Sequence, residues 1–303
     1  MISFYGSEIS YFQVITAAVF VVCGPLVGGL IAGFDRKITA RMQGRQGPPV
    51  LQPFYDVLKL MEKEPATVRG SQDFYIMTSL IFCVITGVFF FGGGNLLMVI
   101  FTLTTADILL VLGGFASNSS YSQIGAEREL VQLMSTEPMI ILLTIGLFLA
   151  KGSFGVAEII SGGPVAFPYL AGLFIGVLYI FTIKLRKSPF DLSMSHHMHQ
   201  ELVKGLTTEF SGRTLAAIEM MHWYENVIFL GFIFLFFANG TPLWWVLGIV
   251  VCLFLYFVEI LIDNTYARMR WQFTLKSAWA VTIIFGGANL LVLYYLHASQ
   301  LLS

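Results

Sequence analysis

Charge is what this 303-residue sequence has least of. Asp, Glu, Lys and Arg together make up 12% of it, about half of the roughly 25% found in soluble domains. Hydrophobic residues make up 56%, more than the about 45–50% of an ordinary domain. This composition excludes a disordered chain, a nucleic-acid-binding protein and an ordinary soluble enzyme, and it predicts an all-α polytopic protein of the lipid bilayer.

Cysteine is also scarce. Cys23, Cys83 and Cys252 each stand alone in an apolar segment, without CxxC spacing. This pattern excludes a disulfide framework and an iron–sulfur cluster held by the chain, and it is typical of small packing residues. No internal repeat is visible, and no polar stretch is long enough for a soluble domain. We therefore predict a single integral membrane domain over residues 1–303.

Apolar segments long enough to cross a bilayer recur along the chain, since a spanning helix needs about 20 mainly apolar residues. Residues 51–63 also carry apolar side chains on one helical stripe, but they are too few to span. We predict an amphipathic helix at the membrane surface there, in the first connection. The eight predicted spans are 11–34, 74–92, 95–116, 133–151, 165–184, 215–238, 243–263 and 278–297.

The basic residues predict the orientation. Sixteen of the 17 lie in the connections after the first, third, fifth and seventh spans, and only Lys151 lies in the others. Basic residues gather on the cytoplasmic side of a membrane protein. We therefore predict that the large polar loops are cytoplasmic and that both termini lie outside.

Acidic residues also occur within the predicted spans, where an ionised carboxylate costs at least about 2.5–3.5 kcal/mol. Two interpretations are open: each acid is a helix-end residue paired with an arginine, or the acids together form a proton-accessible path. Because no lysine lies in the middle of a span, the second interpretation predicts a path built from carboxylates. The polar side chains concerned are Asp107, Glu137, Glu219, His222, Glu225, Glu259 and Asp263.

The densest polar stretch is residues 184–213, which mixes charge with apolar side chains. Such a loop is expected to be buried against the protein or to line a cavity. Its His196, His197 and His199 follow HHxH spacing, which is a weak metal signal without a partner carboxylate or cysteine. We favour histidines that form hydrogen bonds at an interface over a metal site.

Four motifs resemble the membrane "heel" subunit shared by respiratory complex I and energy-converting [NiFe] hydrogenases. They are GRQGPPVLQPFYDVLKLMEKE at 44–64, IGAEREL…STEPM at 124–139, SPFDL…QELVKGLTTEFSG at 188–212 and DNTYARMRW at 263–271. They occur in the family's order over about 230 residues.

Within that family the chain looks more like the Ech-type hydrogenase branch. The SHHMHQE segment at 195–201 lengthens the gap between PFDL and ELV, and the acid expected in the sixth span is replaced near His222. The ERK motif of the quinone-reducing branch reads DRK at 35–37. These departures make a quinone-shaped chamber doubtful.

The resemblance implies roles for individual residues. Arg36 and Arg128 fall on basic positions of the family and would be charge partners of its functional acids, and Asp107, His222 and Glu225 join those acids as relay candidates. The loop residues Gly44, Arg45, Gly47 and Pro48, with His196, His197 and His199, would brace the docking face. The functional acids of the family fall on Glu129, Glu137, Asp191, Glu201 and Glu209.

The resemblance further implies a subunit without cofactors in a membrane-bound hydrogenase of the prokaryotic cytoplasmic membrane. The [NiFe] centre and the iron–sulfur clusters would lie in a [NiFe] large subunit, a small iron–sulfur subunit and a polyferredoxin-like subunit. Ferredoxin would supply electrons, and an antiporter-like membrane subunit would move H⁺ or Na⁺. Two alternatives stay open: the quinone-site subunit of a complex I-type NADH dehydrogenase, and a non-redox ion transporter subunit.

Overall fold

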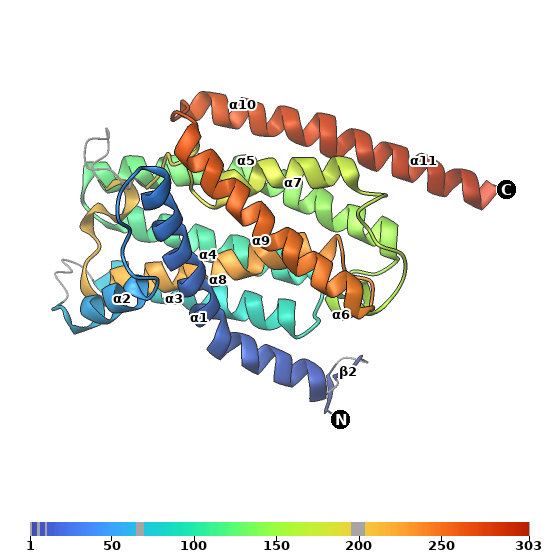
Figure 1. Ribbon diagram of the computed structural model, residues 1–303, viewed down its shortest axis with the longest axis horizontal. Helices are drawn as coiled ribbons and strands as arrows, with labels where there is room; N and C mark the ends of the chain where they lie inside the picture. The colour runs from blue at the N-terminus through green and yellow to red at the C-terminus, as the bar shows by residue number, and fades with distance from the viewer. Residues whose placement is uncertain (1, 5–6, 10, 65–69, 195–203, 303) are drawn as a thin grey trace.

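The computed structural model describes residues 2–4, 7–9, 11–64, 70–194 and 204–302 (Figure 1). It is helical apart from a short antiparallel pair, β1 (Ile2–Phe4) and β2 (Ser7–Ile9). The long helices are α1 (Tyr11–Met42), α3 (Gly70–Phe91), α4 (Leu96–Ala116), α5 (Ser120–Lys151), α8 (Gly212–Leu235) and α9 (Pro242–Thr265). The shorter elements are α2 (Gln52–Glu62), α6 (Val156–Ser161), α7 (Ala171–Lys184), η1 (Gly205–Glu209), α10 (Trp271–Val281), η2 (Thr282–Gly287) and α11 (Ala288–Leu302).

Six helical stretches in the described part of the chain are long and apolar enough to cross a membrane. They are α1, α3, α4, α5, α9 and the continuous rod formed by α10, η2 and α11. The two remaining predicted spans correspond to α7, which has 14 residues, and α8, which carries charged side chains. The all-α polytopic fold predicted from composition and hydropathy is thereby confirmed.

Several helices run past the ends of their apolar segments. The predicted first span ends at residue 34, but α1 continues through the charged DRK triplet to Met42. The predicted fourth span begins at residue 133, but α5 begins at Ser120. Hydropathy marks the part of a helix that suits lipid, whereas the helix itself continues as long as its backbone hydrogen bonds are favoured. The polar turns added to α5 carry Glu129 into the site described below.

The predicted amphipathic helix is α2, with bounds within one residue of those expected. Its Phe54 ring lies 5.2 Å from that of Trp223 on α8, and Val57 is buried in the same small cluster. Leu58 and Met61 of the predicted apolar stripe are exposed instead. The helix therefore packs on the bundle by one edge and presents a second apolar edge to its surroundings.

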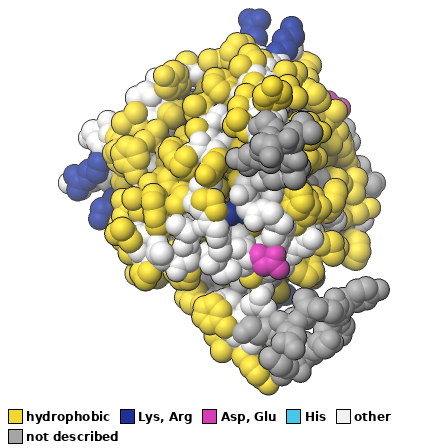
Figure 2. Space-filling view, turned by 90° about the vertical axis from the view of Figure 1, so that its right-hand side faces the viewer, with side chains coloured by type: hydrophobic (Ala, Val, Ile, Leu, Met, Phe, Trp, Pro, Cys, Tyr) yellow, Lys and Arg dark blue, Asp and Glu magenta, His cyan; other side chains and the backbone are white. Residues whose placement is uncertain are grey.

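The two ends of the bundle differ in charge. The end where α1 finishes, α2 lies and α5 and α8 begin carries most of the basic residues, and we call it the basic end (Figure 1). At the other end, hydrophobic and uncharged side chains dominate the surface (Figure 2). Lys151 lies there, and its Nζ donates to the carbonyl oxygens of Gly162 and Ala238, each at 3.0 Å.

Close packing holds the segment after α7 in place at the basic end. Gly125 on α5 lies directly against the backbone of Leu206, so that a Cβ at this position would overlap it. Ser122 donates its hydroxyl to the Leu206 carbonyl at 2.7 Å. Gln132 donates to the Phe190 carbonyl at 2.6 Å. The polar first turns of α5 thus pack against this segment and hold it by hydrogen bonds.

Candidate functional site: a charged cavity beside a buried ion-pair array

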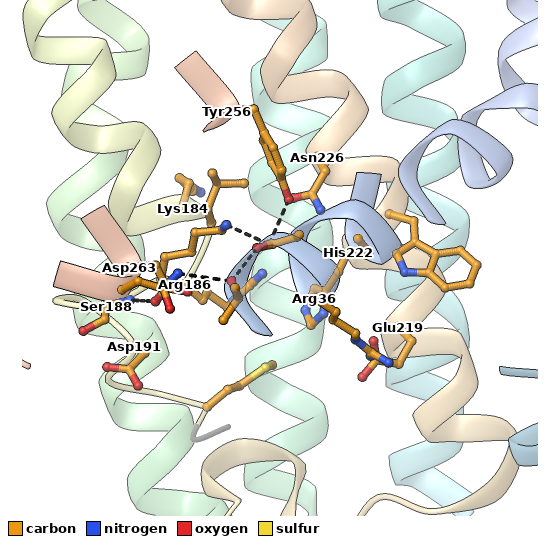
Figure 3. Close-up of a pocket in the computed structure, with 18 of the residues that line it drawn as sticks. Arg36, Lys184, Arg186, Ser188, Asp191, Glu219, His222, Asn226, Tyr256 and Asp263 are labelled. Carbon is orange, nitrogen blue, oxygen red and sulfur yellow. Dashed lines mark hydrogen bonds and ion pairs between the residues drawn. The ribbon is translucent and has the colours of Figure 1, made fainter. Parts of the chain in front are cut away.

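A cavity of about 570 Å³ opens at the basic end. It lies between α1, α8, α9 and the segment that follows α7. In Figure 3, Arg36 and Glu219 lie on one side of it, Ser188, Asp191 and Asp263 lie on the other, and Tyr256 and Asn226 reach in between them. Ten of its 21 lining residues are charged, six basic and four acidic.

The wall formed by α1 and α9 is held by a three-residue contact. The Lys187 Nζ lies 2.7 Å from the Asp35 Oδ2, and the Tyr256 hydroxyl donates to the same oxygen at 3.2 Å. The Lys187 ammonium also lies 4.8 Å from the centroid of the Tyr256 ring. Asp35 belongs to the DRK triplet, so this motif turns its acid toward the cavity.

The opposite wall joins the segment after α7 to the end of α9. The Arg268 Nε lies 2.9 Å from the Asp191 Oδ1, and its Nη2 also contacts the Asp191 carbonyl. The Ser188 backbone N–H donates to the Asp263 Oδ1 at 2.8 Å. These contacts bring the PFDL and DNTYARMRW motifs together, although about 70 residues separate them along the chain.

Behind the cavity lies a set of ion pairs removed from solvent, which we call the buried array. It consists of Lys184 and Arg186 with the carboxylates of Asp107, Glu129, Glu137 and Glu225.

Lys184 ends α7 and connects α4 with α5. Its Nζ lies 2.7 Å from the Asp107 Oδ2 and 3.4 Å from the Glu137 Oε1. Glu137 also accepts a 2.8 Å hydrogen bond from the Thr104 hydroxyl. A buried carboxylate needs such partners, because water cannot stabilise its charge.

Arg186 connects α5 with α8. Its guanidinium donates to the Glu129 Oε1 at 3.0 and 2.8 Å, and to the Glu225 Oε2 at 3.0 Å. Burial alone would lower the pKa of Arg186, but the charges of Glu129 and Glu225 outweigh it and the pKa is raised above its ordinary value. The backbone φ of Arg186 is 52°, a left-handed conformation that is unfavourable for a residue with a side chain. The two carboxylates hold the arginine in this conformation.

Three cations, Lys184, Arg186 and Lys187, thus lie within four residues of one another and form ion pairs with two different groups of carboxylates. All three line the cavity, but Lys184 and Arg186 pair with the carboxylates of the buried array, whereas Lys187 pairs with Asp35. Burying one cation with two carboxylates leaves an excess of negative charge that must bind protons or be offset by nearby groups. The arrangement can therefore respond to a change in the electric field at the cavity by changing its protonation.

The structure brings together several side chains predicted from the sequence. Asp107, Glu129, Glu137 and Glu225 meet in the buried array, and Asp191 and His222 line the cavity. Glu209 lies exposed on η1, away from both groups. Glu201, His196, His197 and His199 lie outside the described residues.

Of the two predicted charge partners, Arg36 has a different carboxylate beside it. Arg36 pairs with Asp56 on α2, at 2.6 Å, rather than with one of the functional acids. Arg128 is half-buried on α5. The cations of the buried array are Lys184 and Arg186, which the sequence reasoning counted only as loop residues that set the orientation. No lysine was expected in the middle of a span, and Lys184 reaches the carboxylates of the array from the end of α7.

The predicted docking residues lie in the turn between α1 and α2. Gly44 and Arg45 are exposed, Gly47 and Pro48 are half-buried, and Arg45 also lines the cavity. The φ of Gly44 is 71°, which suits glycine at this tight turn. Among the described residues, no group of three His, Cys, Asp or Glu side chains is placed to hold a metal ion.

The fold and the site define a multi-pass membrane protein with a charged cavity at one end and a buried ion-pair array behind it. The model of the NADH dehydrogenase family matches residues 14–294, and the chain belongs to this family. The resemblance to the heel subunit is thereby confirmed at the level of the family. The chain is a membrane subunit of the complex I-like oxidoreductase type.

Curated relatives match along most of the chain. The H subunit of the NADH-quinone oxidoreductase of Bacillus cytotoxicus is 30% identical, over 92% of each chain. Its counterpart in Bacillus thuringiensis is 29% identical over the same shares. Among solved structures, a chain of the membrane-bound sulfane sulfur reductase, an archaeal respiratory membrane complex, matches with a TM-score of 0.81 and 22% identity. That match covers 93% of this chain and 99% of the other, and it shows a shared fold.

Proposed function

We propose that this chain is the membrane coupling subunit of a ferredoxin-dependent energy-converting [NiFe] hydrogenase. The observation that carries the proposal is the continuity between the charged cavity and the buried array. Three cations within four residues connect them, so that a charge that moves near the cavity acts on carboxylates inside the membrane domain. A shift of one pKa unit needs only about 1.36 kcal/mol, which is within the reach of a nearby redox change.

In this proposal the redox chemistry belongs to the partners. A [NiFe] large subunit, a small iron–sulfur subunit and a polyferredoxin-like subunit dock on the basic end, and they hold the [NiFe] centre and the iron–sulfur clusters. Ferredoxin supplies the electrons, and protons are reduced to hydrogen. This chain binds no cofactor itself. Its acids pass the response to an antiporter-like membrane subunit, which exports H⁺ or Na⁺.

The orientation that goes with this function places the basic end in the cytoplasm and both termini outside. It is supported by the asymmetry of the bundle, since the end away from the cavity is dominated by uncharged side chains (Figure 2). Cysteine labelling of intact cells tests the orientation. A cysteine introduced at Gly44 should be labelled only after the membrane is opened, whereas one at Gly163 should be labelled from outside.

The experiment that tests the function is a purification of the detergent-extracted complex through a tag on this chain. We expect nickel and iron in the preparation, hydrogen evolution driven by reduced ferredoxin, and ion transport in proteoliposomes. Glu137→Gln should leave the complex assembled and lower the number of ions moved per electron pair. Glu158→Gln is the matched control, because Glu158 is exposed at the other end of the bundle. Full transport by the Glu137→Gln complex would refute the role of the array.

A second candidate is the quinone-site subunit of a complex I-type NADH dehydrogenase. It is favoured by the 570 Å³ volume of the cavity, which is large enough for a quinone head group. The names of the curated relatives point the same way. The hydrogenase is favoured instead by the sequence, since the DRK triplet at 35–37 and the SHHMHQE segment at 195–201 depart from the pattern of the quinone-reducing branch. A preparation that reduces quinone with NADH and lacks nickel would establish this second candidate instead.

A further inference from the structure

A second hollow, which we call the lateral groove, lies beside the cavity between α2 and the start of α8. It has a volume of about 480 Å³ and shares Arg36 and Glu219 with the cavity, so the two spaces adjoin there. Four basic and two acidic side chains line it, and its other lining residues are apolar. Neither the buried array nor the turn between α1 and α2 contributes to this groove.

The two acids of the lateral groove do not cancel its basic side chains. The Asp56 Oδ2 lies 2.6 Å from the Arg36 Nη1, and the Asp56 Oδ1 accepts a hydrogen bond from the Gln52 amide at 2.8 Å. Asp56 and Arg36 therefore neutralise each other. The second acid is Glu219, which is half-buried on α8.

The three other basic side chains of the groove are Lys59 and Lys63 on α2 and Lys204, which directly precedes η1. All three are exposed. Within the described part of the chain, no ion pair joins them to a carboxylate. Glu62 and Glu64 also lie near the end of α2, but neither lines the groove. Because three ammonium groups face one carboxylate, the groove attracts an anion.

Next to the lysines, α2 presents an apolar edge to its surroundings. Leu51, Tyr55 and Leu58 follow one another at spacings of four and three residues, and they are 49%, 51% and 57% exposed. At about 100° per residue, Lys59 and Lys63 fall between this edge and the side of α2 that is turned to the groove. A lysine in such a place extends its apolar stem along the helix and keeps its ammonium group in water.

This order of apolar edge, ammonium groups and groove fits a phospholipid better than a soluble anion. A soluble anion would meet the charge and leave the apolar edge of α2 uncovered. A phospholipid meets both, because its phosphate is anionic and its acyl chains are apolar. Helices with basic side chains beside an apolar edge lie at the headgroup level of a bilayer, and each cation there raises the affinity for anionic lipid about fivefold.

We propose that the lateral groove binds the headgroup of an anionic phospholipid from the leaflet at the basic end. Lys59, Lys63 and Lys204 hold the phosphate group, and the acyl chains lie along Tyr55 and Leu58. The lipid is thereby a neighbour of the charged cavity, although it does not enter it. This inference goes beyond the proposed function, since it does not depend on which redox reaction the complex performs.

Photo-crosslinking of the whole complex in nanodiscs tests the proposal. The complex carries Leu58→p-benzoylphenylalanine and is placed in a bilayer of phosphatidylcholine. The bilayer also contains a trace of either phosphatidylglycerol or phosphatidylcholine that is labelled in its acyl chain. At equal amounts, we expect this chain to be labelled about fivefold or more strongly by phosphatidylglycerol. Equal labelling by the two lipids overturns the proposal.

Two double variants test whether the groove causes this preference. Lys59→Gln with Lys63→Gln should abolish it. Lys37→Gln with Arg41→Gln is the matched control, because these exposed residues are also four positions apart on one helix and line neither the cavity nor the groove. This control should keep the preference. A preference that survives the first pair, or falls as much with the second, overturns the assignment to the groove.

The remaining arms distinguish other occupants. Inorganic phosphate in large excess should leave the labelling unchanged, and its loss would show a site for a soluble anion instead. Absence of labelling by both lipids would show that a protein covers α2, and this also overturns the proposal. If the Leu58 variant does not assemble, the crosslinker is placed at the exposed Tyr55. Because no electron or ion transfer is measured, a negative result leaves the proposed function standing.

Discussion

Two kinds of ion pair occur at the basic end of this protein. Arg186 is buried with Glu129 and Glu225, and these three side chains are at most 10% exposed. Arg36 pairs with Asp56 at the surface, where the side chains are 43% and 39% exposed. The distances are similar, at 2.6–3.0 Å. Burial therefore decides what each pair contributes, and distance does not.

The physical reason lies in what happens when one partner is removed. A surface carboxylate that loses its arginine is solvated by water, so the pair contributes about 0–1 kcal/mol. A buried carboxylate that loses its arginine keeps its charge in a medium that cannot stabilise it, which costs about 3–5 kcal/mol. Removing one partner of a buried pair should therefore destabilise the fold strongly, whereas removing one partner of the surface pair should change its stability little.

The largest effect is expected for Arg186→Gln. It leaves Glu129 and Glu225 without their cation, and the free energy of unfolding should fall by about 3–5 kcal/mol. The melting temperature of the purified complex measures the loss. The matched control removes all three charges together, as Glu129→Gln, Arg186→Met and Glu225→Gln. This triple variant should recover most of the stability, and a triple variant as unstable as the single one would contradict the interpretation.

A smaller loss is expected for Lys184→Met. Asp107 would lose its cation, while Glu137 would keep the hydrogen bond from Thr104. We expect a loss of about 2–3 kcal/mol, read from the same melting curves. Adding Asp107→Asn should restore part of it, because the uncompensated charge is then gone. A loss that exceeds that of Arg186→Gln would reverse the ranking of the two cations.

The smallest effect is expected for Arg36→Gln. Because Arg36 and Asp56 are solvated, stability should change by less than about 1 kcal/mol. The change should shrink further at high ionic strength, since salt screens exposed pairs far more than buried ones. Melting curves at low and high salt measure both. A loss as large as that of Lys184→Met would show that this pair is sealed off in the assembled complex.

The sequence predicted the helices well because apolar length is a local property. Eight spans and the surface helix at 51–63 correspond to helices of the structure. The helix ends were less predictable, because hydropathy marks the part of a helix that suits the lipid and does not show where its backbone hydrogen bonds end. The start of α5 at Ser120 is an example, because its polar turns are buried by the segment after α7 and not by an apolar pattern of their own.

The acids of the site were also predictable, because a carboxylate in an apolar segment stands out. Their partners were not. Lys184 lies 77 residues from Asp107, and Arg186 lies 57 residues from Glu129. Only the fold brings them together, and in the sequence they read as orienting charges beside a span. The sequence did contain one local signal. Lys184, Arg186 and Lys187 lie close together at the end of an apolar segment, and so dense a group of basic residues indicates a role besides orienting the helix in the membrane.

The short stretch that carries Lys184, Arg186 and Lys187 has a mechanical consequence. The Cα atoms of residues 184 and 187 are three peptide units apart, so the chain limits them to roughly 11 Å whatever surrounds them. Bilayers of different thickness tilt and shift whole helices, but they cannot change this covalent spacing. Transmission between the cavity and the interior should therefore be insensitive to the acyl-chain length of the membrane, even where the contacts with neighbouring subunits are not.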